Sequence, residues 1–568
     1  MKLKFAICAF FAAATLLHAD KTFKFDDYLS AANGDGIVAM TRIISKIKTL
    51  NGEPARVELS GREYDFKRFD AIPAFITADG LENATINGNG ASISIDPYNS
   101  FAHLSKCKNV AIKNFTVRYG KKDFTQGEVL SVDADNGSFV FKVQSGYPLL
   151  PDDEFLKKCS RRGWAWGSFF DPDKPQLKSG DDITHVVFIK DLARRGQGVY
   201  EVFPKVKKIL QSVRAGDRFV MSTFFEYNPN FINTHIDIRY SGSILLENLT
   251  MRGVKGMYGA GHSLGVFGGN NFGKVTISKC NFTYRDKGDL ISGVADAIHF
   301  KNCAVGPDVL NCRFEGLLDD FINISANPVR IVKDLGGNRY KLNRHTGVIE
   351  AGAPLGIYYS NTGKWLEGIT VLSIEKGVMT TDKPIPDPVE WYPQDSNMAF
   401  TLGETWRNRD MTHVFNLNRV SDNFRISGNY FGHQRARAAV IRARNGVIEN
   451  NVCDGPVRGF WISNEAGDFH EGPIPANITF RGNTFKNVRR YCVLVSAVNS
   501  QKNFVPQLGG VRFEGNEYRL TPSSRDVAIY ISNGRDFTFK DETYISSSGE
   551  KIDRGQAVKV LGAAAKSK

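Results

Sequence analysis

The 568-residue chain contains little cysteine and no long apolar segment beyond its first twenty residues. None of the eight cysteines forms a Cys-x-x-Cys pair, so a structural zinc site is not expected. No later segment reaches the ~20 apolar residues that span a bilayer. Charged residues make up 23% and hydrophobic residues 42%, which excludes disordered, collagen-like and coiled-coil proteins.

The first nineteen residues have the pattern of a secretory signal peptide. Lys2 and Lys4 precede the apolar run Phe5–Leu17, and Ala19 supplies a small residue before the expected cleavage point. We therefore expect an exported protein, periplasmic or secreted, without a lipid anchor. Seven cysteines would remain after cleavage, an odd number that excludes a fully paired disulfide set within one chain.

The formal net charge of +13 indicates a basic protein. Such a charge would favour anionic surfaces or glycans, although short clusters such as Lys205–Lys208 are more typical of a solvated face. The chain has no helix-turn-helix, zinc-finger or RNP pattern, so nucleic acid is not an expected partner.

A short motif recurs along the chain. It has an apolar residue, two variable residues, Asn or Cys, one variable residue, and then an aromatic or apolar residue. The clearer copies are Ile277-Cys280-Phe282, Val309-Cys312-Phe314, Ile426-Asn429-Phe431, Ile448-Asn451-Cys453, Phe480-Asn483-Phe485, Phe513-Asn516-Tyr518 and Phe539-Glu542-Tyr544. Most copies follow one another at 22 to 33 residues, and each copy alternates like a strand. This pattern predicts an all-β solenoid.

The Asn and Cys positions of the motif predict an inward ladder at a turn. Identical side chains stacked on successive coils would hydrogen-bond to one another, or pack in the case of Cys280 and Cys312. We therefore interpret these two cysteines as core thiols rather than catalytic groups.

Two gaps in the repeat are too long for one coil. From Ile112 to Leu246 and from Val309 to Ile426, subtracting a coil of about 30 residues leaves inserts of about 100 and about 85. Asn136-Gly137 in the first insert, and Gly336-Gly337 and Lys376-Gly377 in the second, predict hairpins. Both inserts are expected to be small antiparallel β domains, barrel-like in form.

The start of the predicted mature chain fits a cap on the solenoid. Ile37, Met40, Ile43, Ile44 and Ile47 recur at helical spacing, and a helix there would cover the open end. The predicted divisions are 1–19 signal peptide, 20–119 N-terminal β-helix with capping helix, 120–225 inserted β domain, 226–326 β-helix coils with catalytic Asp residues, 327–405 second inserted β domain, and 406–568 C-terminal coils.

Three carboxylates are the candidate catalytic groups. The segments around Asp296 (GVADAIHF) and Asp319-Asp320 (LLDDFINI) are alike and stand about one coil apart. Their side chains should therefore lie on neighbouring strands ~4.8 Å apart. Like-charge repulsion should raise at least one pKa, which suits a general acid beside a general base. A turn ladder of Asp or a Ca²⁺ site are the alternative interpretations.

Candidate substrate-binding residues surround this cluster. Counting one coil on from Phe314 to Phe431 places Arg437 in line with Asp320, and Trp461 on the following coil is suited to stacking on a pyranose ring. Arg pairs on β faces are also common as salt-bridged surface, and Trp461 is equally compatible with a core position. The candidates are Tyr258, His262, His299, Arg435, Arg437, Arg458, Trp461 and Glu465.

With an Asp and then an Asp pair one coil later, the chain is similar to the polygalacturonase group of right-handed parallel β-helix hydrolases. Its whole layout resembles glycoside hydrolase family 110 more, the bacterial exo-acting α-1,3-galactosidases active on blood-group B type glycans. That resemblance rests on the two Asp segments and the two inserts, and it covers nearly all of the predicted mature chain. The Gly-His-Gly and Arg-Ile-Lys segments that polygalacturonases carry after the Asp pair are missing, which argues against galacturonan as substrate.

The resemblance implies release of terminal α-1,3-linked galactose with inversion of configuration, without metal or cofactor. By analogy with polygalacturonases, Asp319 would protonate the departing oxygen, while Asp296 and Asp320 would hold and activate water. The expected partner is a galactose-terminated oligosaccharide or glycoconjugate. Neither a required fucosylated branch nor the oligomeric state follows from the sequence.

Three other functions remain open at this stage. A Ca²⁺-dependent polysaccharide lyase on the same fold would need these acids for the cation and a base such as Arg437. A polygalacturonase-like endo-hydrolase would lower the viscosity of a polymer. A non-catalytic β-solenoid adhesin would show no turnover and would tolerate loss of Asp319.

Overall fold

The structure is a computed structural model that describes most of residues 21–561. The description omits 67–73, 96–99, 120–121, 123, 151–165, 179–186, 223–233, 254–263, 344–347, 392–409, 467–469, 502, 506, 525–526 and 533. The expected signal peptide and two of the candidate binding residues, Tyr258 and His262, therefore lie outside the described residues.

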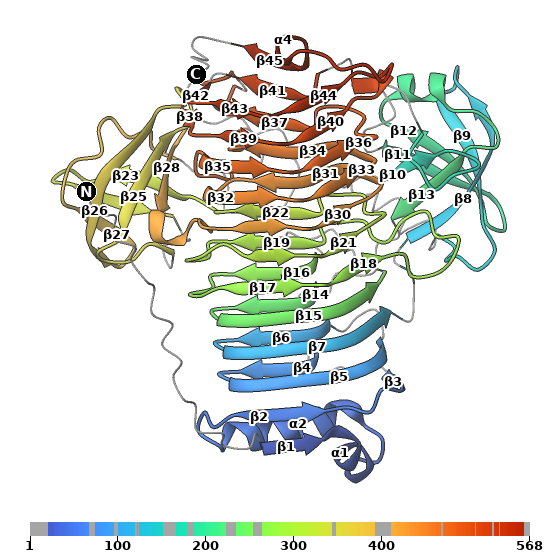
Figure 1. The fold of residues 1–568 in the computed structure, drawn as a ribbon, viewed down its shortest axis with the longest axis horizontal. Helices are drawn as coiled ribbons and strands as arrows, with labels where there is room; N and C mark the ends of the chain where they lie inside the picture. The colour runs from blue at the N-terminus through green and yellow to red at the C-terminus, as the bar shows by residue number, and fades with distance from the viewer. Residues whose placement is uncertain are drawn as a thin grey trace, which may run out of the picture.

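Most of the described chain winds into a right-handed parallel β-helix, which confirms the predicted fold class (Figure 1). Its larger sheet has 22 strands within the described residues, all paired in parallel. These strands are β1 Lys21–Lys24, β2 Ala55–Glu58, β3 Glu63–Phe66, β5 Glu82–Ile95, β7 Lys108–Tyr119, β15 Gly242–Arg252, β17 Val275–Ser278, β18 Asn281–Thr283, β20 Asp308–Leu310, β21 Arg313–Phe314, β29 Arg425–Ser427, β30 Tyr430–Phe431, β32 Arg444–Glu449, β33 Val452–Asp454, β35 Ala476–Arg481, β36 Thr484–Lys486, β38 Leu508–Gly509, β39 Arg512–Glu514, β40 Glu517–Arg519, β42 Gly534–Arg535, β43 Thr538–Lys540 and β44 Thr543–Ile545.

A second parallel sheet, with 11 strands in the described part of the chain, forms the side of the solenoid that carries the candidate site. We call it the site sheet. Its strands are β4 Ala74–Asp79, β6 Ser100–Ser105, β14 Thr234–Arg239, β16 Leu264–Gly269, β19 Ile298–Lys301, β22 Ile322–Ser325, β31 Gln434–Ile441, β34 Pro456–Ser463, β37 Val493–Ser496, β41 Ile529–Ser532 and β45 Val558–Leu561. Alternate residues point into the common core, so the remaining side chains form its outer face.

The predicted ladder runs through the interior. Asn429, Asn451, Asn483 and Asn516 are buried, and each amide Nδ2 donates to the next side chain at 2.8–3.1 Å, ending on Glu542. Each side chain also receives a backbone N–H, so the ladder satisfies polar groups that the turn would otherwise bury without partners.

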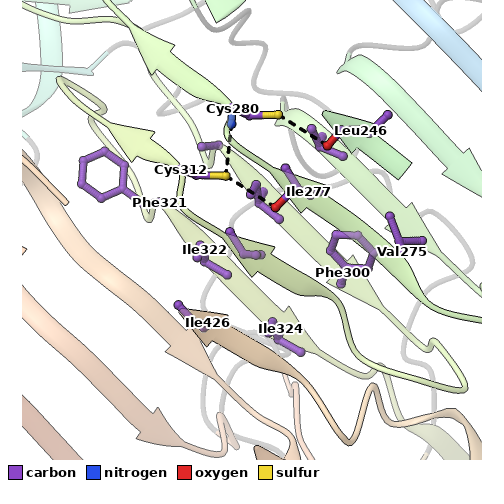
Figure 2. Close-up of a cluster of buried hydrophobic side chains, with 14 of the residues drawn as sticks. Leu246, Val275, Ile277, Cys280, Phe300, Cys312, Phe321, Ile322, Ile324 and Ile426 are labelled. Carbon is purple, nitrogen blue, oxygen red and sulfur yellow. Dashed lines mark hydrogen bonds between the residues drawn. The ribbon is translucent and has the colours of Figure 1, made fainter. Parts of the chain in front are cut away.

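Two cysteines continue this ladder toward the N-terminus. The Cys312 N–H donates to Asn429 Oδ1 at 2.8 Å, and the Cys280 N–H lies 3.4 Å from Cys312 Sγ (Figure 2). Both thiols are free and buried among apolar side chains such as Ile277 and Phe321. This confirms their interpretation as core thiols.

The two inserts are closed six-stranded antiparallel barrels on opposite sides of the solenoid (Figure 1). The first barrel consists of β8 Phe124–Asp133, β9 Ser138–Val143, β10 Trp166–Phe170, β11 Val187–Gly196, β12 Val199–Pro204 and β13 Arg218–Ser222. The second consists of β23 Val329–Asp334, β24 Arg339–Leu342, β25 Pro354–Tyr359, β26 Trp365–Glu375, β27 Val378–Thr381 and β28 Thr412–Asn416. The three predicted hairpins form within them, while β28 closes the second barrel beyond the predicted boundary at residue 405.

The N-terminal end is capped by helices, as predicted. α1 Phe25–Ala31 precedes α2 Gly36–Lys48, whose buried residues include the five predicted apolar positions. Asp35 caps α2 by accepting from two backbone N–H groups at 3.0 Å. The other helical segments are η1 Lys207–Ser212, η3 Leu417–Arg419, η4 Pro522–Ser524 and α4 Arg554–Ala557. Among the described helices, none is long and apolar enough to cross a membrane.

Candidate active site

The three predicted acids meet at the entrance of two neighbouring strands of the site sheet. Asp296 precedes β19, and Asp319 and Asp320 precede β22; the register Ile298 to Ile322 places Asp296 beside Asp320. One carboxylate oxygen from each Asp lies within 4.8 Å of the others. The spacing agrees with the prediction from neighbouring coils.

The three carboxyls differ in exposure. The side chains of Asp296 and Asp320 are 9% and 6% exposed, whereas that of Asp319 is 33% exposed. Asp319 is thus the acid that a molecule arriving from solvent meets first.

Burial and mutual repulsion set the electrostatics of the cluster. Burial and the charges of Asp296 and Asp320 raise the pKa of Asp319 to about 7, although Arg435 and Arg437 oppose the rise. Burial, Asp320 and Glu471 raise the pKa of Asp296 well above its usual value. At neutral pH the cluster therefore holds protons, which a general acid requires.

His299 of β19 supports Asp296, which lies just before that strand. Its Nδ1 shares a hydrogen bond of 2.9 Å with Asp296 Oδ2, while Asp296 Oδ1 accepts from the Asp320 backbone N–H at 3.1 Å. Burial, followed by the nearby Lys301 charge, holds the pKa of His299 well below its usual value, so the ring is neutral. These two bonds fix the orientation of the Asp296 carboxyl.

Two predicted arginines contact the Asp pair. Arg437 lies on β31 in register with Asp320, as counting along the coils predicted, and its Nη1 donates to both Asp320 oxygens at 2.9 Å. Arg435 Nη2 lies 3.4 Å from Asp319 Oδ1, and its Nε donates to the Leu318 carbonyl. Each partner of the Asp pair therefore has its own guanidinium.

The next coil places Arg458 and Trp461 beside these groups. Arg458 is in register with Arg437, and burial together with the charges of Arg437, Arg490 and Arg435 lowers its pKa to about 9. The Arg437 guanidinium lies 4.3 Å from the centre of the Trp461 ring. Trp461 is thus on the outer face rather than in the core, and one of its ring faces is covered by Arg437.

Glu465 lies farther along the same coil, in the loop after β34. Its Oε2 accepts from the His470 backbone N–H at 2.7 Å. It borders a small cavity that Tyr358 and His413 of the second barrel also line. The structure thus places Glu465 at the junction with the second barrel.

One buried ionic group beside the site was missed from the sequence. Glu471 pairs with Lys301 at 2.6 Å and with Arg442 at 2.9 Å, and Arg442 also donates to Asn323 at 3.3 Å. Their side chains are at most 9% exposed. Lys301 follows the outward alternation of His299, which was an available signal, whereas Glu471 lies in an irregular loop without one.

The first barrel packs beside the candidate site through a buried tryptophan. Trp166 of β10 packs in an apolar cluster with Leu318, the residue directly before Asp319. The Arg435 guanidinium lies 5.9 Å from the centre of the Trp166 ring. The first barrel is therefore close to two neighbours of Asp319, Leu318 and Arg435.

Fold and site together define a right-handed parallel β-helix protein with a carboxylate cluster on the outer face of one sheet. No protein-family model matches the chain. Curated relatives include Alpha-1,3-galactosidase A of Bacteroides thetaiotaomicron, 23% identical over 74% of this chain and 70% of the relative. Alpha-1,3-galactosidase B of Phocaeicola vulgatus is 22% identical over 92% of this chain and 93% of the relative. The chain is thus a homologue of bacterial α-1,3-galactosidases, which confirms the resemblance seen in its motifs.

Similar solved structures include an exopolygalacturonase of Thermotoga maritima, with 12% identity and a TM-score of 0.38 over 96% of this chain and 92% of that chain. The catalytic unit of an α-1,3-glucanase of Streptomyces thermodiastaticus has 9% identity and a TM-score of 0.41 over 97% and 69%. Because both scores are low, the description of the fold rests on the strand register of the chain itself.

Proposed function

We propose that the protein is an exo-acting glycoside hydrolase that releases terminal α-1,3-linked galactose with inversion of configuration. The observation that carries this proposal is the meeting of three carboxyls with unequal surroundings at one point of the outer face. The names and broad coverage of the curated relatives support galactose as the sugar released.

Asp319 is the proposed general acid. Its carboxyl is the most exposed of the three, and a pKa of about 7 keeps it protonated in much of the neutral range. In the reaction the Asp319 proton passes to the glycosidic oxygen as the bond to the galactose anomeric carbon breaks.

Asp320 is the proposed base, with Asp296 as its partner in holding the water. Arg437 stabilises the Asp320 carboxylate through two charge-assisted hydrogen bonds. Asp320 would take a proton from the attacking water while His299 and the Asp320 backbone N–H keep Asp296 in place. The water oxygen then forms the new bond to the anomeric carbon.

The spacing of the carboxyls is not the basis for proposing inversion of configuration. Oxygens within 4.8 Å are closer than the ~6.5–9.5 Å usual for an inverting pair, so inversion rests on the family resemblance. The test is incubation with linear α-1,3-galactobiose and with blood-group B trisaccharide, followed by proton NMR. Early β-galactose supports the proposal, early α-galactose contradicts inversion, and no galactose from either contradicts the function.

The clustering of acids also keeps the Ca²⁺-dependent lyase as a second candidate, because three carboxylates can hold a cation. Arg435 and Arg437 already supply positive charge to two of them, which favours the hydrolase. We therefore expect the rate of galactose release to be unchanged after treatment with EDTA. A loss restored by Ca²⁺, together with absorbance from an unsaturated product, would favour the lyase.

A further inference from the structure

The outer face of the site sheet carries half-buried aromatic side chains beyond the Asp cluster. The parallel register aligns Trp461 of β34 with Leu494 of β37, Tyr530 of β41 and Lys559 of β45. Tyr491 stands two residues before β37, and its ring centre lies 5.0 Å from that of Tyr530. We call Trp461, Tyr491, Leu494 and Tyr530 the aromatic strip.

The strip belongs to the surface rather than to the core. Its four side chains are half-buried, whereas the flanking Phe460, Val493 and Ile529 are buried in the core of the solenoid. Half-buried tyrosine and tryptophan combine an apolar ring face with a polar edge, the combination that sugar-binding surfaces use.

The strip is continuous with the candidate active site. Trp461 lies beneath the Arg437 guanidinium, which binds Asp320. Three strand steps separate β31, which carries Arg437, from β41, which carries Tyr530. At ~4.8 Å a step these span roughly 14 Å along the solenoid, enough for more than one sugar ring.

The two inserts contact the segments that flank β37, one before the strand and one after it. Arg489, just before β37, donates to the carbonyls of Leu177 and Lys178 in the first insert. After β37, Asn499 donates to the Asn361 carbonyl in the second insert at 3.0 Å. Figure 1 shows the barrels on either side, with β34, β37 and β41 between them.

In the opposite direction, the described outer face of the sheet carries paired charged side chains instead of an aromatic strip. Phe267 on β16 lies between His299 and the Arg239 guanidinium, with ring-centre distances of 6.2 and 5.3 Å. Arg239 and His103 both bind Asp237, which is completely buried. The described surface therefore favours the C-terminal direction for the rest of a substrate.

We propose that the aromatic strip binds the sugars on the leaving-group side of the scissile bond, so that the preferred substrate is a galactose-terminated chain of three or more sugars. This inference rests on the proposed function, because it takes the Asp cluster as the position of the terminal galactose. Trp461 and Tyr491 face the sugar next to the bond, and Tyr530 faces a more distant one.

The test measures binding separately from turnover. In the Asp319→Asn background, calorimetry compares a linear disaccharide with a linear tetrasaccharide, both ending in α-1,3-linked galactose. We expect the tetrasaccharide to bind about tenfold more tightly, because its extra sugars would gain a well-packed contact with the aromatic strip. Tyr530→Ala should remove the difference and Tyr530→Phe should keep it. Tyr240→Ala, at an exposed turn position, is the matched control and should change nothing.

Equal affinities for the two oligosaccharides would overturn the proposal that the aromatic strip binds the leaving-group sugars. A difference in affinity that survives Tyr530→Ala, in a variant with unchanged thermal unfolding, would overturn it as well. Failure of the proposed function has a separate signature, since the wild-type protein would then release no galactose from either oligosaccharide.

Discussion

At the scale of single residues, the proposed chemistry depends on the pKa of Asp319, which its surroundings shift in opposite directions. Burial and then the charges of Asp296 and Asp320 raise the pKa of Asp319, while Arg435 at 3.4 Å and Arg437 lower it. The proposed acid works only when protonated, so kcat/KM should fall as the pH rises through about 7.

Replacing Arg435 by Met should move this decline to higher pH. The substitution removes a positive charge that stabilises ionised Asp319, so its pKa should rise further, by roughly one pH unit. The measurement is kcat/KM from pH 5 to 9 for the wild type and for Arg435→Met. A decline that stays in place or moves to lower pH would contradict Asp319 as the titrating acid.

At the scale of structural elements, the asparagine ladder holds successive coils in register. Asn451 accepts from the Asn429 N–H and side chain and donates to the Ile426 carbonyl and to Asn483, all at 2.9–3.0 Å. Any replacement without an amide leaves several buried polar groups without partners.

Asn451→Ala should therefore lower the free energy of unfolding by roughly 3 kcal/mol. Asn281→Ala is the matched control, because this half-buried strand residue makes a single 3.4 Å side-chain bond, and its effect should stay within about 0.5 kcal/mol. Urea unfolding followed by circular dichroism gives both values. Equal effects of the two substitutions would show that the ladder adds nothing beyond an ordinary surface bond.

The first barrel approaches the site through Trp166, which lies 5.9 Å from the Arg435 guanidinium and shares an apolar cluster with Leu318, the residue before Asp319. Trp166→Leu should loosen Arg435 and shift the decline of kcat/KM to higher pH, by less than Arg435→Met does. Phe188→Leu, on an exposed part of the same barrel, should leave the pH profile unchanged. A Trp166→Leu variant that is less stable but keeps the wild-type pH profile would contradict this expectation. It would show that Trp166 packs the barrel without positioning Arg435.

At the scale of the whole molecule, the repeat carries most of what the sequence could predict. The likeness of their two segments aligned Asp296 with Asp320, and the step from Phe314 to Phe431 aligned Arg437 with Asp320, because strand register turns a residue count directly into proximity. In irregular segments, the number of residues between two positions does not predict their proximity. The loop that carries Glu471 and the strand β28, which closes the second barrel, depend on long-range pairing that no local pattern records.

The central claim is that Asp319 donates the proton while Asp320 activates water, and its most direct test varies the leaving group. An activated aryl α-galactoside needs little protonation, whereas an α-1,3-linked disaccharide needs a general acid. Asp319→Asn should keep much of its kcat/KM on the aryl substrate and lose at least about a hundredfold on the disaccharide, whereas Asp320→Asn should lose both. The reverse pattern, with aryl hydrolysis surviving in Asp320→Asn and not in Asp319→Asn, would contradict this assignment.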